Sequence, residues 1–194
     1  MDTMLADASF VDLLDRFAAP TPTPGAGPAA AATAAVGVAL LQMVSALPKT
    51  RADEPGERAA LNETAARLPP IRTALLAAMD ADAAAYDAVI AARKRPASTE
   101  AEREARRAAI QAAMRRATDT PLEIVRLAAD GLRHASVVGA NGHRAASGEI
   151  GVATTLLRAG LKGARVCVEI NLNFLADEAY KAGVAAELRT LGPA

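Results

Sequence analysis

Apolar side chains recur at helical spacing along most of this sequence. Within residues 8–18 they come every three or four positions, the spacing that places side chains on one helix face: Phe10, Leu13, Leu14 and Phe17. No segment alternates convincingly with a period of two residues, and "RVCVEINL" (165–172) is the nearest candidate strand. The pattern therefore predicts an all-α fold, a helical bundle.

The second predicted helix has no polar face. The stretch 28–47 contains no Asp, Glu, Lys or Arg, and it follows the Pro/Gly-rich loop "TPTPGAGP". Its length is close to that of a membrane span, but it is mostly alanine, which contributes little to membrane insertion. A helix that is apolar all round also suits the centre of a protein or an oligomer. We favour the buried helix, in which Ala30, Ala34 and Gly37 would let neighbouring helices approach closely.

Start and stop signals divide the remainder into further helices. A helical region at 55–93 is interrupted at Pro69 and Pro70, because proline lacks a backbone donor, and "KRPAS" is a second break. A capping box, Thr99 with Glu102, starts a helix to about 117, and Thr120 starts another to about 136. Helices at 147–160 and 176–191 follow, with Gly163 as a breaker. No repeat or linker divides the chain, so we expect one domain over residues 1–194.

Composition excludes several classes of protein. The chain of 194 residues carries 22 basic and 22 acidic side chains, so no net charge attracts nucleic acid or an anionic membrane. Aromatic residues make up 3%, too few for base-stacking platforms. One cysteine and two histidines cannot form a disulfide or an ordinary zinc cluster. Acidic residues near the N-terminus are unlike a secretory leader, so we expect a cytoplasmic protein.

Five segments, in this order, resemble the cyclodeaminase/cyclohydrolase family. They are "FVDLLDRFAAPTPTPGAGPAAAATAAVGVALLQMV" (10–44), "LPKTR" (47–51), "DADAAAYDAV" (80–89), "ATDTPLEIVR" (117–126) and "EIGVATTLLRAGLKGARVCVEIN" (149–171). The resemblance implies an all-α fold that dimerises through long helices. It also implies a tetrahydrofolate derivative as substrate and no tightly bound cofactor or metal. Either 5,10-methenyltetrahydrofolate is hydrolysed, or 5-formiminotetrahydrofolate loses ammonia and cyclises.

The resemblance also implies which residues form the site. Asp82 and Glu149 would be the proton-transfer carboxylates, since both reactions pass through a tetrahedral carbon between two nitrogens. The substrate would be held by a larger set: Thr23, Pro24, Gly25, Ala26, Gly27, Lys49, Arg51, Tyr86, His143 and Asn171.

Each of these residues also has an interpretation without a ligand. The Pro/Gly loop is compatible with an anion-binding helix start or a tight turn, and Asp82 with a buried acid of raised pKa or a surface acid. Glu149 could simply stabilise a helix N-terminus through its negative charge. Lys49 and Arg51 could likewise stabilise a helix C-terminus through their positive charge. His143 could be a new acid–base group or an exposed loop residue. Asn171 could hold a ligand or cap a helix.

Several positions depart from the family pattern. Ala26 and Pro28 replace a glycine and a serine of the opening loop, where Pro28 removes a donor. In the later loop, His143 and Ala145 replace two asparagines, Gly148 replaces a serine, and Glu149 replaces an aspartate and is one methylene longer. Further along, Cys167 replaces an asparagine. Cys167 is interpreted as an apolar filler rather than a nucleophile.

These departures leave three hypotheses for function. The first is a one-carbon tetrahydrofolate enzyme. The second is a diverged relative that uses the same cleft for C–N addition, hydrolysis or cyclisation on another small molecule in specialised biosynthesis. The third is a non-catalytic binding protein.

Overall fold

The protein is an all-helical bundle, as its periodicity predicts. The computed structural model describes residues 4–192, which form α1 (Phe10–Ala18), α2 (Ala26–Ala46), α3 (Pro55–Arg93), α4 (Glu100–Asn141), α5 (Ser147–Leu172) and α6 (Glu178–Thr190). Two short 3-10 helices, η1 (Leu5–Asp7) and η2 (Arg144–Ala146), precede α1 and α5. The acidic N-terminal segment begins at residues 1–3, which lie outside the described residues.

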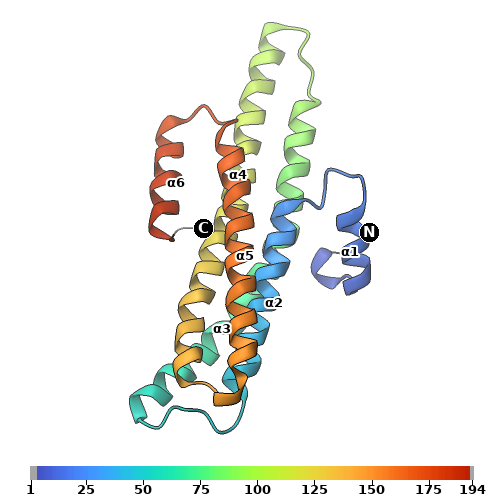
Figure 1. Cartoon of the computed structure of the whole chain (residues 1–194). Helices are drawn as coiled ribbons and strands as arrows, with labels where there is room; N and C mark the ends of the chain where they lie inside the picture. The colour runs from blue at the N-terminus through green and yellow to red at the C-terminus, as the bar shows by residue number, and fades with distance from the viewer. Residues whose placement is uncertain (1–3, 193–194) are drawn as a thin grey trace.

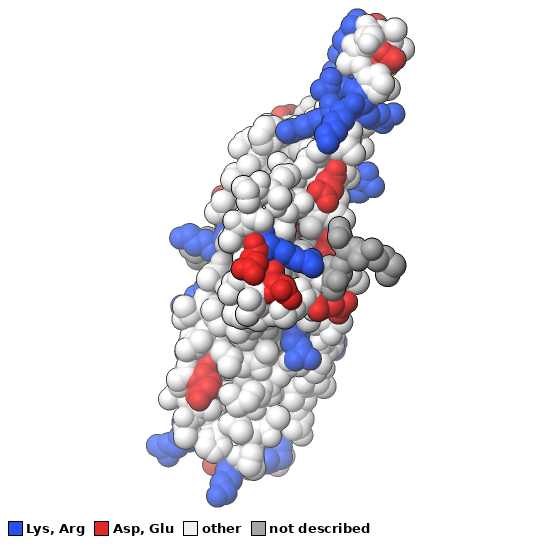
Figure 2. Space-filling model, turned by 90° about the vertical axis from the view of Figure 1, so that its right-hand side faces the viewer, with Lys and Arg blue, Asp and Glu red and all other residues white. Residues whose placement is uncertain are grey.

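Helices α2, α3, α4 and α5 form the bundle, with α1 and α6 on its flanks (Figure 1). The hairpin between α3 and α4 projects beyond the other helices at one end. Figure 2 shows that lysine and arginine gather at this projecting tip, whereas acidic and basic side chains are interspersed among uncharged ones along the side of the bundle that carries α1. The capping box predicted at Thr99 and Glu102 is present and begins α4.

Close contact between α2 and α5 explains the small residues of α2. A Cβ on Gly37 would lie 2.8 Å from the carbonyl oxygen of Ala153, and one on Gly160 would lie 2.7 Å from that of Ala30. Ala34 is fully buried at the same crossing. The prediction of close helix approach at these residues is therefore confirmed. Helix α2 is long and apolar enough to span a membrane: an 18-residue window within it has a mean hydropathy of 1.7, and 44% of that window is buried inside the bundle.

The predicted breaks at Pro69–Pro70 and at Thr120–Pro121 are wrong. Helix α3 runs through Pro69 and Pro70, and α4 runs through Pro121, so Thr120 is an interior residue rather than a cap. An interior proline costs about 3 kcal/mol. Here Leu68 and Leu75, on either side of the proline pair, are both 0% exposed. Packing of the flanking turns thus holds the helix together where the local chain would break it.

The predicted strand at 165–172 and the break at Gly163 are also wrong, because α5 continues from Ser147 to Leu172. Burial follows the helical period there: Leu161, Ala164 and Val168 face the core, whereas Val166 is 46% exposed. β-branched residues favour strands only weakly, and tertiary packing overrides that preference.

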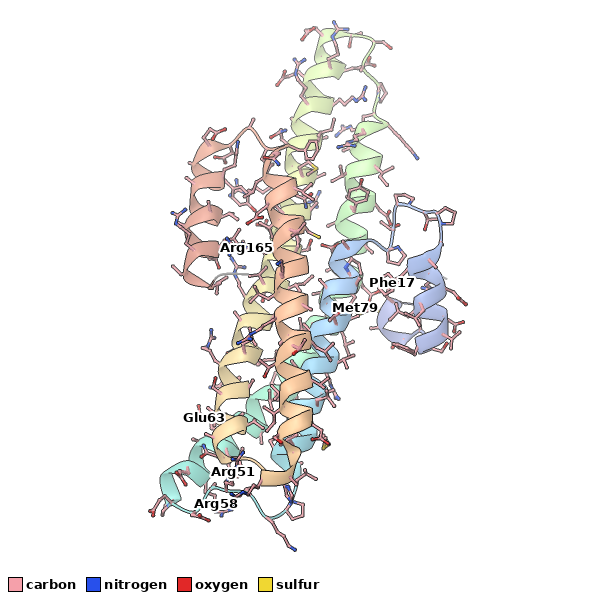
Figure 3. All side chains as sticks on the ribbon, viewed as in Figure 1. Phe17, Arg51, Arg58, Glu63, Met79 and Arg165 are labelled. Atoms are coloured by element: carbon pink, nitrogen blue, oxygen red, sulfur yellow. The ribbon has the colours of Figure 1, made fainter. Side chains whose placement is uncertain are left out.

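Helix α6 is attached by side chains from two bundle helices. Arg126 of α4 donates to both carboxylate oxygens of Glu187, at 2.6 and 2.9 Å. Arg165 of α5, labelled in Figure 3, reaches the carbonyl oxygens of Leu188 and Gly192 at 3.3 and 3.0 Å. The short last helix is therefore fixed by ion pairing and capping in addition to its two buried side chains, Val184 and Leu188.

Candidate active site

A cavity of about 230 Å³ lies beside the N-terminus of α2. Its wall comes from the loop before α2 and from α2, α3, α4 and α5. The lining residues are Pro22, Thr23, Gly25, Ala26, Gly27, Asp82, Ala83, Tyr86, Ala117, Cys167, Ile170 and Asn171. Much of the predicted site, scattered over nearly 150 positions of sequence, therefore meets in one place.

Asp82 is the carboxylate of this cavity. It projects from α3 against the first turn of α2, so closely that a Cβ on Gly27 would lie 2.3 Å from Oδ2. The Thr120 hydroxyl donates to Asp82 Oδ1 at 3.1 Å. Burial raises the pKa of the Asp82 carboxyl above its usual value, and the hydrogen bond from Thr120 partly offsets that rise. Asp82 is thus a partly desolvated acid, the type of group that general acid–base chemistry uses.

The Pro/Gly loop leads directly into the first turn of α2. Gly25 is its N-cap, Ala26 and Gly27 lie in the first turn, and Pro28 follows. The first N–H groups of a helix have no partner within it, and proline removes one of them, so this helix end offers fewer donors than one with serine at that position. Thr23 is held from the other side, because its hydroxyl donates to Asp87 Oδ1 at 3.1 Å.

Ala26 does not strain the loop. The one non-glycine residue with positive φ within residues 4–192 is Lys49, so Ala26 adopts an ordinary backbone conformation. The glycine that the cavity requires is Gly27, because any side chain there meets Asp82. Of the two departures in this loop, Pro28 changes the chemistry more than Ala26 does.

Helix α5 supplies Cys167 and Asn171 to the cavity wall. Burial, reinforced by the Asp82 charge, raises the pKa of the Cys167 thiol to about 11, so the sulfur is a neutral thiol near pH 7. The Asn171 amide donates to the Ala117 carbonyl oxygen at 2.6 Å, which ties α5 to α4. Its side-chain oxygen remains for a ligand. Tyr86, 38% exposed, lies one helical turn after Asp82 at the cavity rim.

Four predicted site residues lie at the other end of the bundle: Lys49, Arg51, His143 and Glu149. Glu149 is exposed in the first turn of α5, and 22 residues of that helix, about 33 Å, separate it from Asn171 at the cavity. One copy of the chain therefore does not bring Asp82 and Glu149 together.

Two of these four have structural partners at their own end. Arg51, labelled in Figure 3, donates through its guanidinium to the Gly139 carbonyl oxygen at 2.8 Å, and its backbone N–H binds the end of α4. The His143 ring accepts from the Ala145 N–H at 3.1 Å and so caps η2. Lys49 and Glu149 are exposed.

Sequence reasoning missed Thr120 as part of this site. It lies 38 residues from Asp82 in sequence, and the Thr-Pro pair was interpreted as a helix start. Only the packing of α3 against α4 puts its hydroxyl on the carboxylate. Pro22, Ala83, Ala117 and Ile170 were also missed, because small and apolar wall residues carry no chemical signature in a sequence.

The cavity is lined by one acidic side chain among neutral ones. Asp82 is its one carboxylate, and no Lys, Arg or His is among the described residues that line it. Within residues 4–192, no three His, Cys, Asp or Glu side chains gather in a way that could hold a metal ion. A desolvated carboxylate without a neighbouring cation favours a ligand that carries positive charge or donates hydrogen bonds.

An all-helical bundle with a partly buried carboxylic acid facing a small cavity is an arrangement suited to an enzyme acting on a small molecule. The comparison with known families makes this class specific. The chain belongs to the formiminotransferase-cyclodeaminase family, which matches residues 9–190.

Curated relatives agree with this assignment. A methenyltetrahydrofolate cyclohydrolase of Methylorubrum extorquens is 33% identical over 188 residues, which are 97% of this chain and 90% of that protein. The formimidoyltransferase-cyclodeaminase of Sus scrofa is 36% identical over 161 residues, 81% of this chain and 29% of that protein. The chain therefore spans less than a third of this second relative.

A solved structure has the same fold. The crystal structure of formiminotetrahydrofolate cyclodeaminase from Thermotoga maritima superposes with a TM-score of 0.83 over 95% of this chain and 88% of that one, at 23% sequence identity.

Proposed function

We propose that this protein is a one-carbon tetrahydrofolate enzyme that hydrolyses 5,10-methenyltetrahydrofolate, with Asp82 as its acid–base residue. The observation that carries the proposal is the partly buried Asp82 carboxylate, alone among neutral groups in a cavity of about 230 Å³. The reacting group of methenyltetrahydrofolate is a cationic carbon shared by two nitrogens, and a lone carboxylate complements that charge.

Hydrolysis is favoured over cyclodeamination by sequence identity among the relatives matched over most of their length. The cyclohydrolase relative is 33% identical and matched over 90% of its length, whereas the Thermotoga maritima cyclodeaminase, matched over 88% of its chain, is 23% identical. Closure of 5-formiminotetrahydrofolate with loss of ammonia would place the same kind of carbon beside the same carboxylate, so the cavity would accommodate it as well.

The reaction needs one group that takes a proton and returns it. Water attacks the carbon between the two nitrogens while the Asp82 carboxylate accepts a water proton, which gives a neutral tetrahedral intermediate. The bond from this carbon to one nitrogen then breaks, and the departing nitrogen takes the proton back from Asp82. The remaining hydroxyl loses its proton to solvent and becomes the formyl carbonyl, so one proton is released for each turnover.

Burial equips Asp82 for both steps. Its raised pKa makes the carboxylate a stronger base toward water and keeps the protonated form accessible for the second step. Thr120 and the first turn of α2 hold the carboxyl group in place.

The assay follows loss of the methenyl chromophore in a weakly buffered neutral medium, with and without the protein. Acceleration by the wild-type protein is expected, and Asp82→Asn should lower kcat by about 100- to 10,000-fold, the range for loss of a general acid–base group. If the wild-type protein does not accelerate the reaction, the proposal fails. A thermal shift with tetrahydrofolate would then identify a non-catalytic binding protein.

Further expectations belong to this proposal. Residues 1–194 would act as one domain, in the cytoplasm, where reduced folates and the free Cys167 thiol are stable. Addition of water to a C–N unit exchanges protons but no electrons, so the chemistry requires no tightly bound redox cofactor. The family resemblance supports a homodimer built through long helices, with neither nucleic acid nor a membrane as partner.

A further inference from the structure

A second hollow lies between α3 and α4, which run side by side through the bundle (Figure 1). Its volume is about 330 Å³. The α3 wall of this α3–α4 hollow consists of alanines, and its α4 wall is polar, with Arg116, Asp119 and Thr120. No described residue that lines the hollow also lines the cavity around Asp82. The same pair of helices therefore borders two separate spaces.

The two spaces open on different sides of α3. Asp82 and Tyr86, one turn apart, line the cavity. Ala81 and Ala85, each one position earlier in the chain, line the α3–α4 hollow. Consecutive positions of an α-helix point about 100° apart. A substrate that fills the cavity would therefore leave the hollow open to water.

Thr120 connects the two spaces. It lines the α3–α4 hollow, and its hydroxyl donates to Asp82 Oδ1 in the cavity wall at 3.1 Å. The same hydroxyl lies 3.4 Å from the carbonyl oxygen of Arg116, one turn earlier in α4. A hydroxyl has a single hydrogen and two acceptor lone pairs, and it rotates to suit its partners. Thr120 can therefore turn its hydrogen away from Asp82 and accept a hydrogen bond from it instead.

Hydrolysis leaves a proton in the cavity that has to be removed. In the proposed reaction, Asp82 returns its first proton to the departing nitrogen, and the hydroxyl of the intermediate then gives up its own. Asp82 is the carboxylate of the cavity, and no Lys, Arg or His is among the described residues that line it. The second proton therefore passes to Asp82, which must lose it before the next turnover.

We propose that Thr120 is a proton relay, whose hydroxyl passes the proton released in each turnover from Asp82 to water in the α3–α4 hollow. Protonated Asp82 gives its proton to Thr120 Oγ1 while the Thr120 O–H gives its own to a water molecule, so the hydroxyl gains one proton and loses one. It then turns back and donates to the ionised Asp82, as in the structure. The inference rests on the proposed function, because the proton is the one that hydrolysis releases.

The polar wall of the hollow suits an outgoing proton. Asp119 is exposed, directly precedes Thr120 in α4, and accepts a hydrogen bond from the Tyr180 hydroxyl at 2.6 Å. A water molecule between the Thr120 hydroxyl and the Asp119 carboxylate would have polar partners on both sides. The alanines opposite leave room for such water because their side chains are short.

A first-turnover experiment tests the relay. Thr120→Val removes the hydroxyl and keeps the shape of the side chain. Because Asp82 starts ionised, the first turnover should proceed at the wild-type rate, and later turnovers should wait for Asp82 to lose its proton. Stopped-flow absorbance of the methenyl group should therefore show one fast turnover per site and then a steady state slower than that of wild type. On the plateau of its own pH profile, the variant should have a lower kcat and an unchanged kcat/KM.

Two variants serve as controls for this experiment. Thr120→Ser keeps the hydroxyl and should have the wild-type kcat. Thr73→Val makes the same substitution at an exposed position of α3 that lines neither space, and it should keep wild-type kinetics. Urea unfolding of each preparation shows whether the variants are folded.

Buffers of different size test the route of the proton. Imidazole is small enough to approach position 120 through the hollow and to take the proton from Asp82 in place of the hydroxyl. After the rate without protein is subtracted, kcat of Thr120→Val should rise with imidazole concentration far more steeply than with the bulkier base HEPES. The wild-type kcat should depend on neither buffer, because its own hydroxyl supplies the route.

The possible results separate the relay from the proposed function. If Thr120→Val had the wild-type kcat in weak buffer, the relay would be wrong although the enzyme is active. A slow first turnover, with no response to imidazole, would also overturn it and would leave Thr120 the role of holding Asp82 in place. A wild-type protein that does not accelerate hydrolysis would remove the proposed function, and the relay with it.

Discussion

Replacing Gly27 by alanine should separate the activity of this protein from its stability. The added Cβ would lie 2.3, 2.5 and 2.6 Å from Oδ2, Cγ and Oδ1 of Asp82, whereas ordinary contacts begin at 3.4 Å. The carboxyl group must therefore move by about 1 Å. This movement would also disturb the 3.1 Å hydrogen bond from Thr120. A displacement of about 1 Å in a catalytic group costs on the order of 100-fold in rate, which corresponds to about 2.7 kcal/mol of transition-state stabilisation.

The fold should tolerate the same change. The clash is with the end of a side chain, which can rotate away, and alanine is a better helix former than glycine by about 1 kcal/mol. We expect Gly27→Ala to lower kcat/KM by about 100-fold while the midpoint of urea unfolding stays near that of wild type.

The assay is methenyltetrahydrofolate hydrolysis, measured beside urea unfolding of the same preparation. Gly183→Ala, in α6 with nothing within 4 Å of the added Cβ, is the matched control and should keep full activity. If Gly27→Ala were as active as wild type, the position of Asp82 would not matter to the reaction, and its assignment as the acid–base group would be refuted.

Three further predictions follow from the same contacts. Thr120→Val removes a hydrogen bond that lowers the pKa of Asp82, so the acidic limb of the kcat/KM profile should move to higher pH, with Thr120→Ser restoring it; an unmoved profile would contradict this positioning role. Asp82→Asn should have a higher Tm than wild type, by a margin that grows as pH rises above 3.8, the usual pKa of the group. The pKa of Asp82 is raised in the folded state, so wild-type stability falls as the partly buried carboxyl ionises. A Tm difference independent of pH would argue against this. Leu157→Ala should lower the free energy of unfolding by about 2–5 kcal/mol, since Leu157 is 0% exposed and packs against Gly37 and Gly131; a urea midpoint equal to wild type would be inconsistent with that packing.

Local signals in the sequence were reliable where nearby side chains provide the hydrogen-bond partners of the backbone. Thr99 and Glu102 cap α4 as predicted, because both partners of a capping box lie within one turn. The break at "KRPAS" is likewise present between α3 and α4. These features depend on neighbours in sequence, and no distant contact is needed to form them.

Signals failed where a distant contact outweighed the local preference. Pro69 and Pro70 stay inside α3, and the β-branched residues of 165–172 stay helical in α5. In both cases buried side chains on each side of the weak point pack against other helices, and their burial offsets the local cost. Nothing in the local sequence reports the size of that offset.

The same division applies to the candidate site. The family resemblance indicated Asp82 and the Gly25–Gly27 helix start as site residues, where residue types alone left a surface acid and a tight turn open, and the two do meet at the cavity. The order of residues could not indicate that Glu149 and Lys49 lie some 30 Å away along the bundle, nor that the Thr120 hydroxyl lies on Asp82.

The sequence by itself determined the helical class, the charge-free centre of the bundle and the chemistry available to it, because periodicity, composition and residue type are properties of the chain alone. The tertiary structure alone decided which helices continue through their prolines, which acid is partly desolvated and which residues share a cavity. Those outcomes depend on distances between segments far apart in sequence, and on how much surface each contact removes from water.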